Sequence, residues 1–335
     1  MKAVYVLASV ALYINVLTCL DPQLDSEWEN WRIKFQKQGT RVGDVQRREI
    51  WEANYRAVEE HNQRFQEGNA TYKMGMNQFG DLTPEEFLNL TQMTMSRPNT
   101  RSNNQLTGEE LRKAASSLSV TSIDYRTLGY VTPVENQGSC GCCWAFSAAG
   151  ALEAQWMNKT KQLIPLSKQQ LMDCSGDFGN RGCNGGLPFV AYEYIQSIGG
   201  IQAEATYPYA MTKQVCAADK SKFVATVKGW MSLPSGNEQA LEDALVTIGP
   251  VAITIDSTTP SFQFYQSGVF YDPQCTNWKQ NHAMVVVGFG TEGTDNYWII
   301  KNSWGTSWGE NGYLLLAKDQ GDECGVSQNG VIPLV

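Results

Sequence analysis

Residues Gln137–Ser147, with the sequence QGSCGCCWAFS, carry the strongest signal in this 335-residue chain. They place Cys140, Cys142 and Cys143 directly before an apolar segment whose pattern predicts a helix over residues 143–157. The unpaired backbone N–H groups at a helix start favour negative charge, and therefore the thiolate, the nucleophilic form of cysteine. The stretch predicts a reactive thiol that needs a partner base.

Composition places the chain among ordinary globular proteins, with 42% hydrophobic and 18% charged residues. The net charge of −8 argues against nucleic acid as a partner. Residues 1–20 run apolar and give way to an acidic stretch, which predicts a cleaved signal peptide rather than a membrane anchor. We expect a protein of the secretory pathway, in a lysosome-like compartment or outside the cell, that does not bind membranes.

Cysteine usage fits an oxidising compartment. Of nine cysteines, Cys19 lies in the signal region and eight follow residue 139. Six of these eight could form three disulfides and leave two thiols free, with the connectivity open at this point. Sequons at Asn69, Asn89 and Asn158 are compatible with glycosylation.

The region before residue 94 is helical by pattern. Apolar residues recur at three- and four-residue steps over residues 25–66, and Thr83 with Pro84 marks another helix start. Residues 94–122 are polar and unpatterned, which predicts a linker and a natural site of proteolysis.

The region from about residue 123 changes character. After the helix over 143–157, Ser167 and Gln170 form a capping-box pattern, and short strand-like runs then dominate. The runs are Phe223–Met231, Val251–Asp256, Ala283–Phe289, Tyr297–Lys301 and Tyr313–Ala317. A helical half followed by a β-rich half predicts an α+β fold with a cleft between the halves.

Only two histidines occur in the chain, His61 and His282. His61 lies upstream of the predicted linker, so His282 is the only imidazole on the same side as the cysteine cluster. A neutral imidazole is the side chain best suited to accept a thiol proton near neutral pH. A buried structural histidine is the alternative, but the activated thiol favours a catalytic role for His282.

Four motifs in order make a family resemblance specific. They are QGSCGCCWAFS, Cys183-Asn184-Gly185-Gly186, Asn281-His282-Ala283 and Asn302-Ser303-Trp304-Gly305. The chain resembles a papain-family cysteine protease of the cathepsin L-like branch, in precursor form. This implies a signal peptide (1–20), a helical inhibitory pro-segment (21–118), and a protease domain (119–335). The implied protease fold is papain-like, with a helical left domain and a β-barrel-like right domain.

The resemblance places the catalytic residues, and chemistry gives their roles. Cys143 and His282 would rest as a thiolate–imidazolium pair, attack the peptide carbonyl and protonate the leaving amine. Asn302 would orient the imidazole, and Trp304 would shield that hydrogen bond from water. The resemblance assigns Gln137 as a donor to the negative oxygen of the intermediate. No metal or cofactor is expected.

Substrate contacts are also implied by the resemblance. Gly185 and Gly186 would let an extended substrate lie against the backbone, although both could simply be turn glycines. The pocket for the residue two before the scissile bond, P2, is expected to prefer apolar side chains. Its implied residues are Leu187, Pro188, Thr254, Gln280, Ala283 and Asn329.

The remaining cysteines are expected to pair as in the family. The implied disulfides are Cys140–Cys183, Cys174–Cys216 and Cys275–Cys324. This leaves Cys142, where the family usually has serine, as a second free thiol beside Cys143. An exposed thiol there could oxidise or mispair.

The N-terminal region resembles the pro-region of these proteases. The matching residues are Arg47, Trp51, Asn54, Val58 and Asn62, then Gly75, Asn77, Phe79 and Asp81. We expect a latency segment that crosses the cleft and is cleaved near Ser119, rather than an independent helical interaction domain. Protonation of carboxylates that hold the segment predicts self-processing at about pH 4–5.

Three rival functions account for less of the chain. The Cys-x-x-Cys spacing of Cys140 and Cys143 is compatible with a thiol oxidoreductase, and the same cysteines with a zinc site. Neither explains the histidine and asparagine motifs, and a catalytically dead homologue is disfavoured because every expected catalytic residue is present.

The single histidine of the protease domain and the cysteine-free pro-segment favour an open-cleft endopeptidase, with protein and peptide substrates. Cystatin-type proteins are possible inhibitors, and we expect a monomer.

Overall fold

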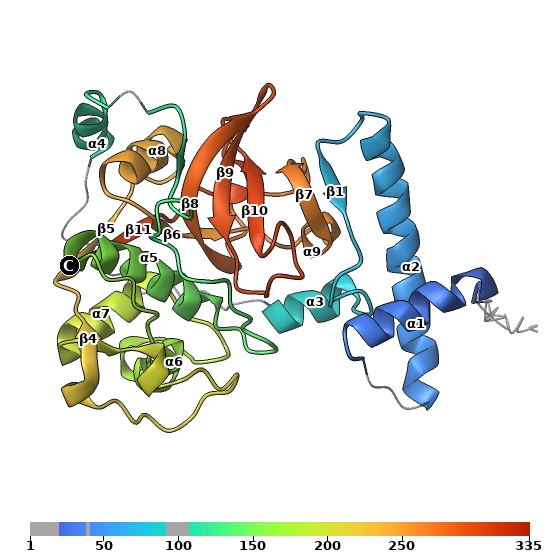
Figure 1. Ribbon diagram of the computed structural model, residues 1–335, viewed down its shortest axis with the longest axis horizontal. Helices are drawn as coiled ribbons and strands as arrows, with labels where there is room; N and C mark the ends of the chain where they lie inside the picture. Colours follow the sequence, from blue (N-terminus) through green and yellow to red (C-terminus); the bar gives the residue numbers. More distant parts are fainter. Residues whose placement is uncertain (1–19, 38–40, 92–106, 119) are drawn as a thin grey trace, which may run out of the picture.

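The computed structural model describes residues 20–37, 41–91, 107–118 and 120–335 (Figure 1). The predicted signal peptide, apart from residue 20, lies outside this part. No helix within the described ranges combines the length and the apolar character needed to cross a membrane.

The predicted N-terminal helical region forms two long helices, α1 (Asp25–Lys34) and α2 (Arg41–Gln66), after a short 3₁₀ turn. Trp28, Trp31 and Trp51 are buried in a small core between them. The Trp28 ring centroid lies 5.4 Å from that of Trp31 and 5.5 Å from that of Trp51. This region therefore has its own apolar core, which α1 and α2 share.

Strand β1 (Tyr72–Met74) joins the N-terminal region to the sheet of the protease half by antiparallel pairing with β7 (Tyr265–Phe270). The Val269 N–H donates to the Thr71 carbonyl at 3.1 Å. A Cβ atom on Gly268, whose φ is +85°, would lie 2.6 Å from the same carbonyl oxygen. The close approach of the two strands therefore requires glycine at this position.

The main sheet has nine strands in the order β1-β7-β10-β9-β8-β6-β11-β5, with β2 paired to β8. This order runs from β1 at one end to β5 at the other, and β8 and β9 lie near its centre. The other strands are β2 (Ile123–Asp124), β5 (Gly229–Ser232), β6 (Val251–Ile255), β8 (His282–Glu292), β9 (Asp295–Lys301), β10 (Tyr313–Ala317) and β11 (Val331–Leu334). A separate two-stranded sheet contains β3 (Ile201–Gln202) and β4 (Phe223–Ala225).

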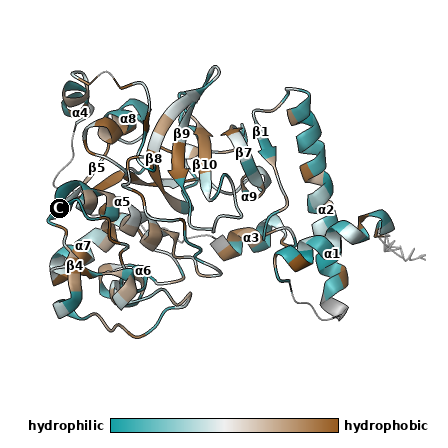
Figure 2. Ribbon diagram, viewed as in Figure 1, coloured by the Kyte–Doolittle hydropathy of each residue, from teal (hydrophilic) through white to brown (hydrophobic). Residues whose placement is uncertain are grey.

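The predicted helix over 143–157 forms α5 (Cys143–Thr160), which packs against β8 and is buried over most of its length. Figure 2 shows apolar residues concentrated in β8 and β9, whereas α2 is mostly hydrophilic. The other helices are α3 (Pro84–Thr91), α4 (Gly108–Ala115), α6 (Lys168–Cys174), α7 (Pro188–Ile198), α8 (Glu238–Thr247) and α9 (Pro260–Gln263). Short 3₁₀ turns are η1 (Pro22–Leu24), η2 (Gly176–Phe178), η3 (Glu204–Thr206), η4 (Lys220–Lys222) and η5 (Glu323–Gly325).

The linker prediction for residues 94–122 is wrong where α4 forms. The Thr107 hydroxyl accepts from the Glu110 N–H at 3.2 Å, and the Glu110 carboxylate accepts from the Thr107 N–H at 2.9 Å. This reciprocal capping box satisfies two N–H groups that a helix start otherwise leaves unpaired. Leu111 is buried, with 2% of its surface exposed. The segment therefore has a capped start and one apolar contact.

Candidate active site

The three predicted catalytic residues meet where the helical half contacts the sheet. Cys143 is the first residue of α5, His282 is the first residue of β8, and Asn302 directly follows β9. Strands β8 and β9 are antiparallel neighbours, which brings His282 and Asn302 together. The Ala283 N–H donates to the Cys143 sulfur at 3.4 Å, so the thiol lies against the start of β8.

Hydrogen bonds fix the tautomer of His282. Its Nε2 lies 2.8 Å from Asn302 Oδ1. The same oxygen accepts from the Ser303 N–H at 2.7 Å, which identifies the atom as oxygen rather than nitrogen. Since Oδ1 can only accept, Nε2 carries the proton and Nδ1 keeps its lone pair. Within the described part of the chain, Nδ1 has no hydrogen-bond partner, as a general base requires.

Aromatic rings cover this hydrogen bond. The Trp304 ring stacks on the His282 ring with centroids 4.4 Å apart, and Trp304 is 1% exposed. Phe79 and Phe87 from the N-terminal region make edge-to-face contacts with the Trp304 ring, at centroid distances of 5.6 and 5.2 Å. The N-terminal region therefore completes the apolar cover of the catalytic histidine.

Burial governs the charges of Cys143 and His282 in the full chain. It raises the pKa of the Cys143 thiol to about 12, although the N–H groups of Ala283 and of the helix start oppose this. It lowers the pKa of His282 to about 4, although the hydrogen bond that His282 donates to Asn302 opposes this. In the full chain, burial thus favours the neutral forms of both groups.

Gln137 is held at each of its polar groups. Its side-chain Nε2 donates to the Cys140 carbonyl at 2.9 Å, and its Oε1 accepts from the Ser303 hydroxyl at 2.6 Å. Its backbone N–H donates to the Ser303 carbonyl at 2.8 Å, and its carbonyl accepts from Tyr209 Oη at 2.7 Å. The amide nitrogen carries two hydrogens, so one remains for another acceptor. Such a fixed donor fits an oxyanion site.

The unusual thiol of Cys142 is buried and belongs to the same network. Its sulfur lies 3.0 Å from Tyr209 Oη. Because Tyr209 donates its proton to the Gln137 carbonyl, the Cys142 thiol is the donor in this contact. Burial raises the pKa of Cys142 to about 12. Cys142 is therefore a protonated hydrogen-bond donor and not the exposed thiol that could oxidise readily.

The disulfides join the pairs that the resemblance implied. The three bonds are Cys140–Cys183, Cys174–Cys216 and Cys275–Cys324, and Cys142 and Cys143 are the free cysteines of the described chain.

These bonds also bear on the rival functions. Cys140 is bonded elsewhere, so it forms no dithiol with Cys143. Cys275 and Cys324 cluster with Glu323, but their sulfurs are bonded to each other and offer no thiolate to a metal ion.

The predicted substrate glycines both have structural reasons to be glycine. Gly185 has a φ of +111°, which disfavours any other residue. A Cβ atom on Gly186 would lie 2.5 Å from Asn180 Oδ1 and 2.7 Å from the Trp144 ring. Asn180 Oδ1 also accepts from the Leu187 N–H at 2.8 Å, so this loop is tightly fixed. Turn geometry accounts for both glycines without reference to a substrate.

The structure brings together four of the residues expected at the P2 pocket. Thr254 Oγ1 donates to Gln280 Oε1 at 2.6 Å, and Asn329 Nδ2 donates to Thr254 Oγ1 at 3.0 Å. Thr254 is paired with Ala283 across β6 and β8. Pro188 begins α7 in the helical half. The polar side chains of this set, Thr254, Gln280 and Asn329, therefore bond to one another.

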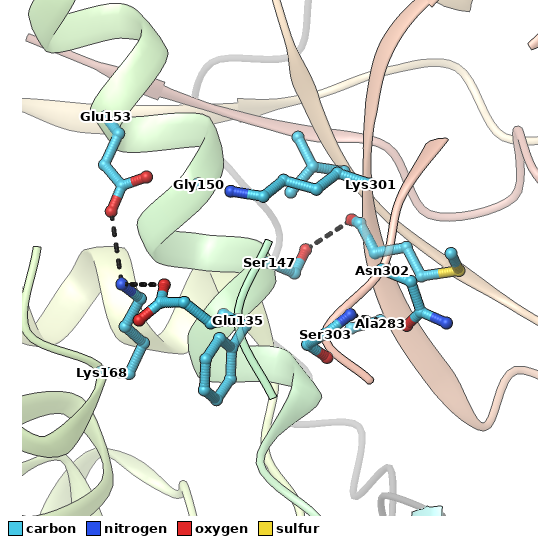
Figure 3. Close-up of a pocket in the computed structure, with 12 residues that line it drawn as sticks. Glu135, Ser147, Gly150, Glu153, Lys168, Ala283, Lys301, Asn302 and Ser303 are labelled. Atoms are coloured by element: carbon cyan, nitrogen blue, oxygen red, sulfur yellow. Dashed lines mark hydrogen bonds and ion pairs between the residues drawn. The ribbon is translucent and has the colours of Figure 1, made fainter. Parts of the chain in front are cut away.

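A buried ion cluster beside the catalytic residues was missed by the sequence analysis. Lys168, which is 2% exposed, lies 2.5 Å from Glu135, 3.6 Å from Glu153 and 3.8 Å from Glu204. Figure 3 shows Lys168 between Glu135 and Glu153, next to the cavity that Asn302 also lines. We call Lys168 and its three glutamates the ion cluster. No sequence signal links them, because they come from four separate parts of the chain.

The ion cluster supports the loop that carries Gln137. The Glu135 carbonyl accepts from the Gly305 N–H at 3.0 Å, which joins this loop to the segment after Asn302. Glu204 accepts from the Tyr209 N–H at 2.6 Å, and Tyr209 in turn bonds to Gln137. The cluster therefore fixes both ends of the network around Gln137.

Comparisons with known proteins agree with this geometry. Residues 119–334 match the papain family cysteine protease domain, and residues 28–87 match the cathepsin propeptide inhibitor domain (I29). The chain is 42% identical to mouse cathepsin K over 315 residues, covering 93% of this chain and 94% of that protein. It is 38% identical to human cathepsin L2, covering 98% of each protein.

Solved structures of precursors are also similar. Digestive procathepsin L 3 from the larval midgut of Tenebrio molitor superposes with a TM-score of 0.83 and 36% identity. The match covers 94% of this chain and 100% of that chain. The fold and site thus define a cysteine peptidase made with an inhibitory propeptide. The chain belongs to the papain family of cysteine proteases, and its relatives place it among the cathepsin L-like members.

We predict that Lys168→Met destabilises the protein strongly. Removing Lys168 takes away the cation that contacts Glu135, Glu153 and Glu204, although Lys301 still interacts with Glu153. Breaking a buried pair costs about 3–5 kcal/mol. The measurement is denaturant unfolding of the full chain carrying Cys143→Ala. Lys222→Met is the matched control, because Lys222 and Asp219 form a pair with 54% and 43% exposed side chains. Similar unfolding curves for the two variants would contradict a structural role for the cluster.

Proposed function

We propose that the protease domain is an endopeptidase that cleaves internal peptide bonds of proteins through Cys143 and His282. The observation that supports this most strongly is the orientation of His282. The Ser303 N–H fixes Asn302, Asn302 places the ring proton on Nε2, and the lone pair of Nδ1 remains for the thiol proton. The domain boundaries at residues 118 and 119 are part of the proposal.

The proposed reaction begins when the pro-segment leaves and water reaches the site. Solvation of both charges lowers the pKa of Cys143 and raises that of His282, so the thiol proton moves to Nδ1. The thiolate attacks the carbonyl carbon, and the negative oxygen accepts from the Gln137 amide and the Cys143 N–H. His282 then protonates the leaving amine. Water, deprotonated by His282, hydrolyses the resulting acyl-enzyme.

Specificity follows from the walls of the P2 pocket. Leu187, which is 6% exposed, and Ala283 present apolar surface. Thr254, Gln280 and Asn329 satisfy one another, so an apolar side chain that enters breaks none of their hydrogen bonds. We therefore propose apolar residues at P2.

The proposed location is the secretory pathway, ending in a lysosome-like compartment or outside the cell. Three disulfides fit an oxidising compartment. Asn69, Asn89 and Asn158 are all exposed, as glycosylation requires. We further propose a monomer that cystatin-type proteins inhibit at the cleft.

The activity is tested with an internally quenched peptide that is blocked at both ends. We predict cleavage by the processed enzyme and no cleavage by Cys143→Ala, whose precursor should also fail to process itself. Cys142→Ser is the matched control, because a serine hydroxyl can still donate to Tyr209, and it should retain most of the activity. Cleavage only of peptides with a free end, or self-processing by Cys143→Ala, would contradict the proposal.

We also propose His61 as a trigger for acid processing, in addition to the carboxylates expected from the sequence. The Arg47 guanidinium hydrogen-bonds Glu86 and lowers the pKa of that carboxyl to about 2, so their ion pair stays intact at about pH 4–5. Burial lowers the pKa of His61 below its ordinary 6.5. His61 Nε2 lies 2.9 Å from the carbonyl of Tyr72 in β1. Below pH 6.5 the unfolded segment binds a proton more readily than the folded one, so stability falls as pH falls.

We therefore predict that His61→Gln moves self-processing to lower pH. Glutamine can still donate to the Tyr72 carbonyl but gains no proton in acid. At about pH 5 the variant should process more slowly, by up to about tenfold for each unit by which burial lowers the pKa of His61. The measurement is the pH profile of the processing rate, with the exposed Glu59→Gln as control. An unchanged profile for His61→Gln would exclude this trigger.

A further inference from the structure

Helix α4 contacts the protease domain far from β1. It packs against α8, and Figure 1 places this pair at the opposite end of the molecule from α1 and α2. A Cβ atom on Gly108 would lie 3.4 Å from Asn237 Nδ2 and 3.8 Å from Pro234 Cγ. The start of α4 therefore lies against the residues that lead into α8. We call the outer face of α8, with Pro234 and Asn237, the α8 surface.

The sequence of α4 suits docking by one apolar side chain. Leu111 is 2% exposed and belongs to the main core cluster, whereas Arg112 and Lys113 on the same helix are exposed. Isolated helices of eight residues are not stable in water. The helix therefore depends on its capping box and on the contact that buries Leu111.

Neither family match accounts for this contact. The propeptide inhibitor domain ends at residue 87 and the protease domain begins at residue 119, so α4 lies between them. The contacts that hold the inhibitor domain are elsewhere. Strand β1 pairs with β7, and Phe87 packs on Trp304 beside the catalytic histidine.

We propose that the α8 surface is a docking site outside the active site, and that α4 of this chain is its occupant in the precursor. It anchors the C-terminal end of the pro-segment independently of β1 and Phe87. This inference rests on the proposed latency of the precursor. The described pro-segment is thus attached on both sides of the undescribed stretch 92–106.

The pro-segment is thus held by two anchors, α4 on the α8 surface and β1 with Phe87, and this makes its dissociation cooperative. When one anchor opens, the other keeps the segment at a high effective concentration, so rebinding is fast. The expected cleavage near Ser119, a residue outside the described part, follows α4 in the sequence. It cuts the covalent link beside this anchor, and the α8 surface of the processed enzyme becomes exposed once α4 dissociates.

The test compares Leu111→Ser with Arg112→Ser in the full chain. Both variants introduce serine into α4, but only the first removes a buried side chain. In a Cys143→Ala background, amide hydrogen exchange should become at least about tenfold faster in α4 and at the α8 surface for Leu111→Ser, while β1 stays protected. Arg112→Ser should leave α8 unchanged. This readout needs no catalysis, so it stands or falls apart from the proposed activity.

The second measurement is the rate at which the same variants process themselves with Cys143 intact. Leu111→Ser should process at least about tenfold faster than the unmodified precursor at the same pH, and Arg112→Ser at the unmodified rate. Unchanged exchange at the α8 surface in Leu111→Ser would overturn docking. Faster exchange without faster processing would overturn the anchoring role.

Discussion

Burial of the Cys143 thiol beside His282 is the constraint on which the rest of the structure depends. The two residues come from the start of α5 and the start of β8, and they meet only because the helical half packs on the sheet. In the full chain, burial favours the neutral form of both groups. The N-terminal region adds to this burial, because Phe79 and Phe87 pack on the Trp304 ring that covers His282.

Hydrogen bonds hold His282 and Gln137 in fixed orientations in this neutral state. Ser303 bonds to both Asn302 and Gln137, so one residue links the group that orients the histidine to the proposed oxyanion donor. The ion cluster around Lys168 supports the loop that carries Gln137, because Glu135 of this loop pairs with Lys168. The hydrogen bonds that orient these groups are thus already present in the precursor.

The sequence was sufficient for the residues that carry local signals. A helix start marked Cys143, the scarcity of histidine marked His282, and Thr83 does cap α3 through the Glu86 N–H. The capping-box pattern of Thr107 and Glu110 is also visible in the sequence, but it lies within a polar stretch that predicts a linker. The ion cluster could not be predicted, because its charges are ordinary surface residue types that only folding buries together. The complete burial of Cys143 could not be predicted for the same reason, since burial is a property of the fold.

The most direct test of the account is the ultraviolet absorbance of the thiolate in a Cys142→Ser chain that lacks residues 1–20, in which Cys143 is the single free thiol among the described residues. It should be recorded across about pH 4–9 for the intact precursor and for the processed enzyme. The account predicts no thiolate in the precursor over this range and a thiolate in the processed enzyme at neutral and mildly acidic pH. A thiolate in the intact precursor near pH 7 would contradict it.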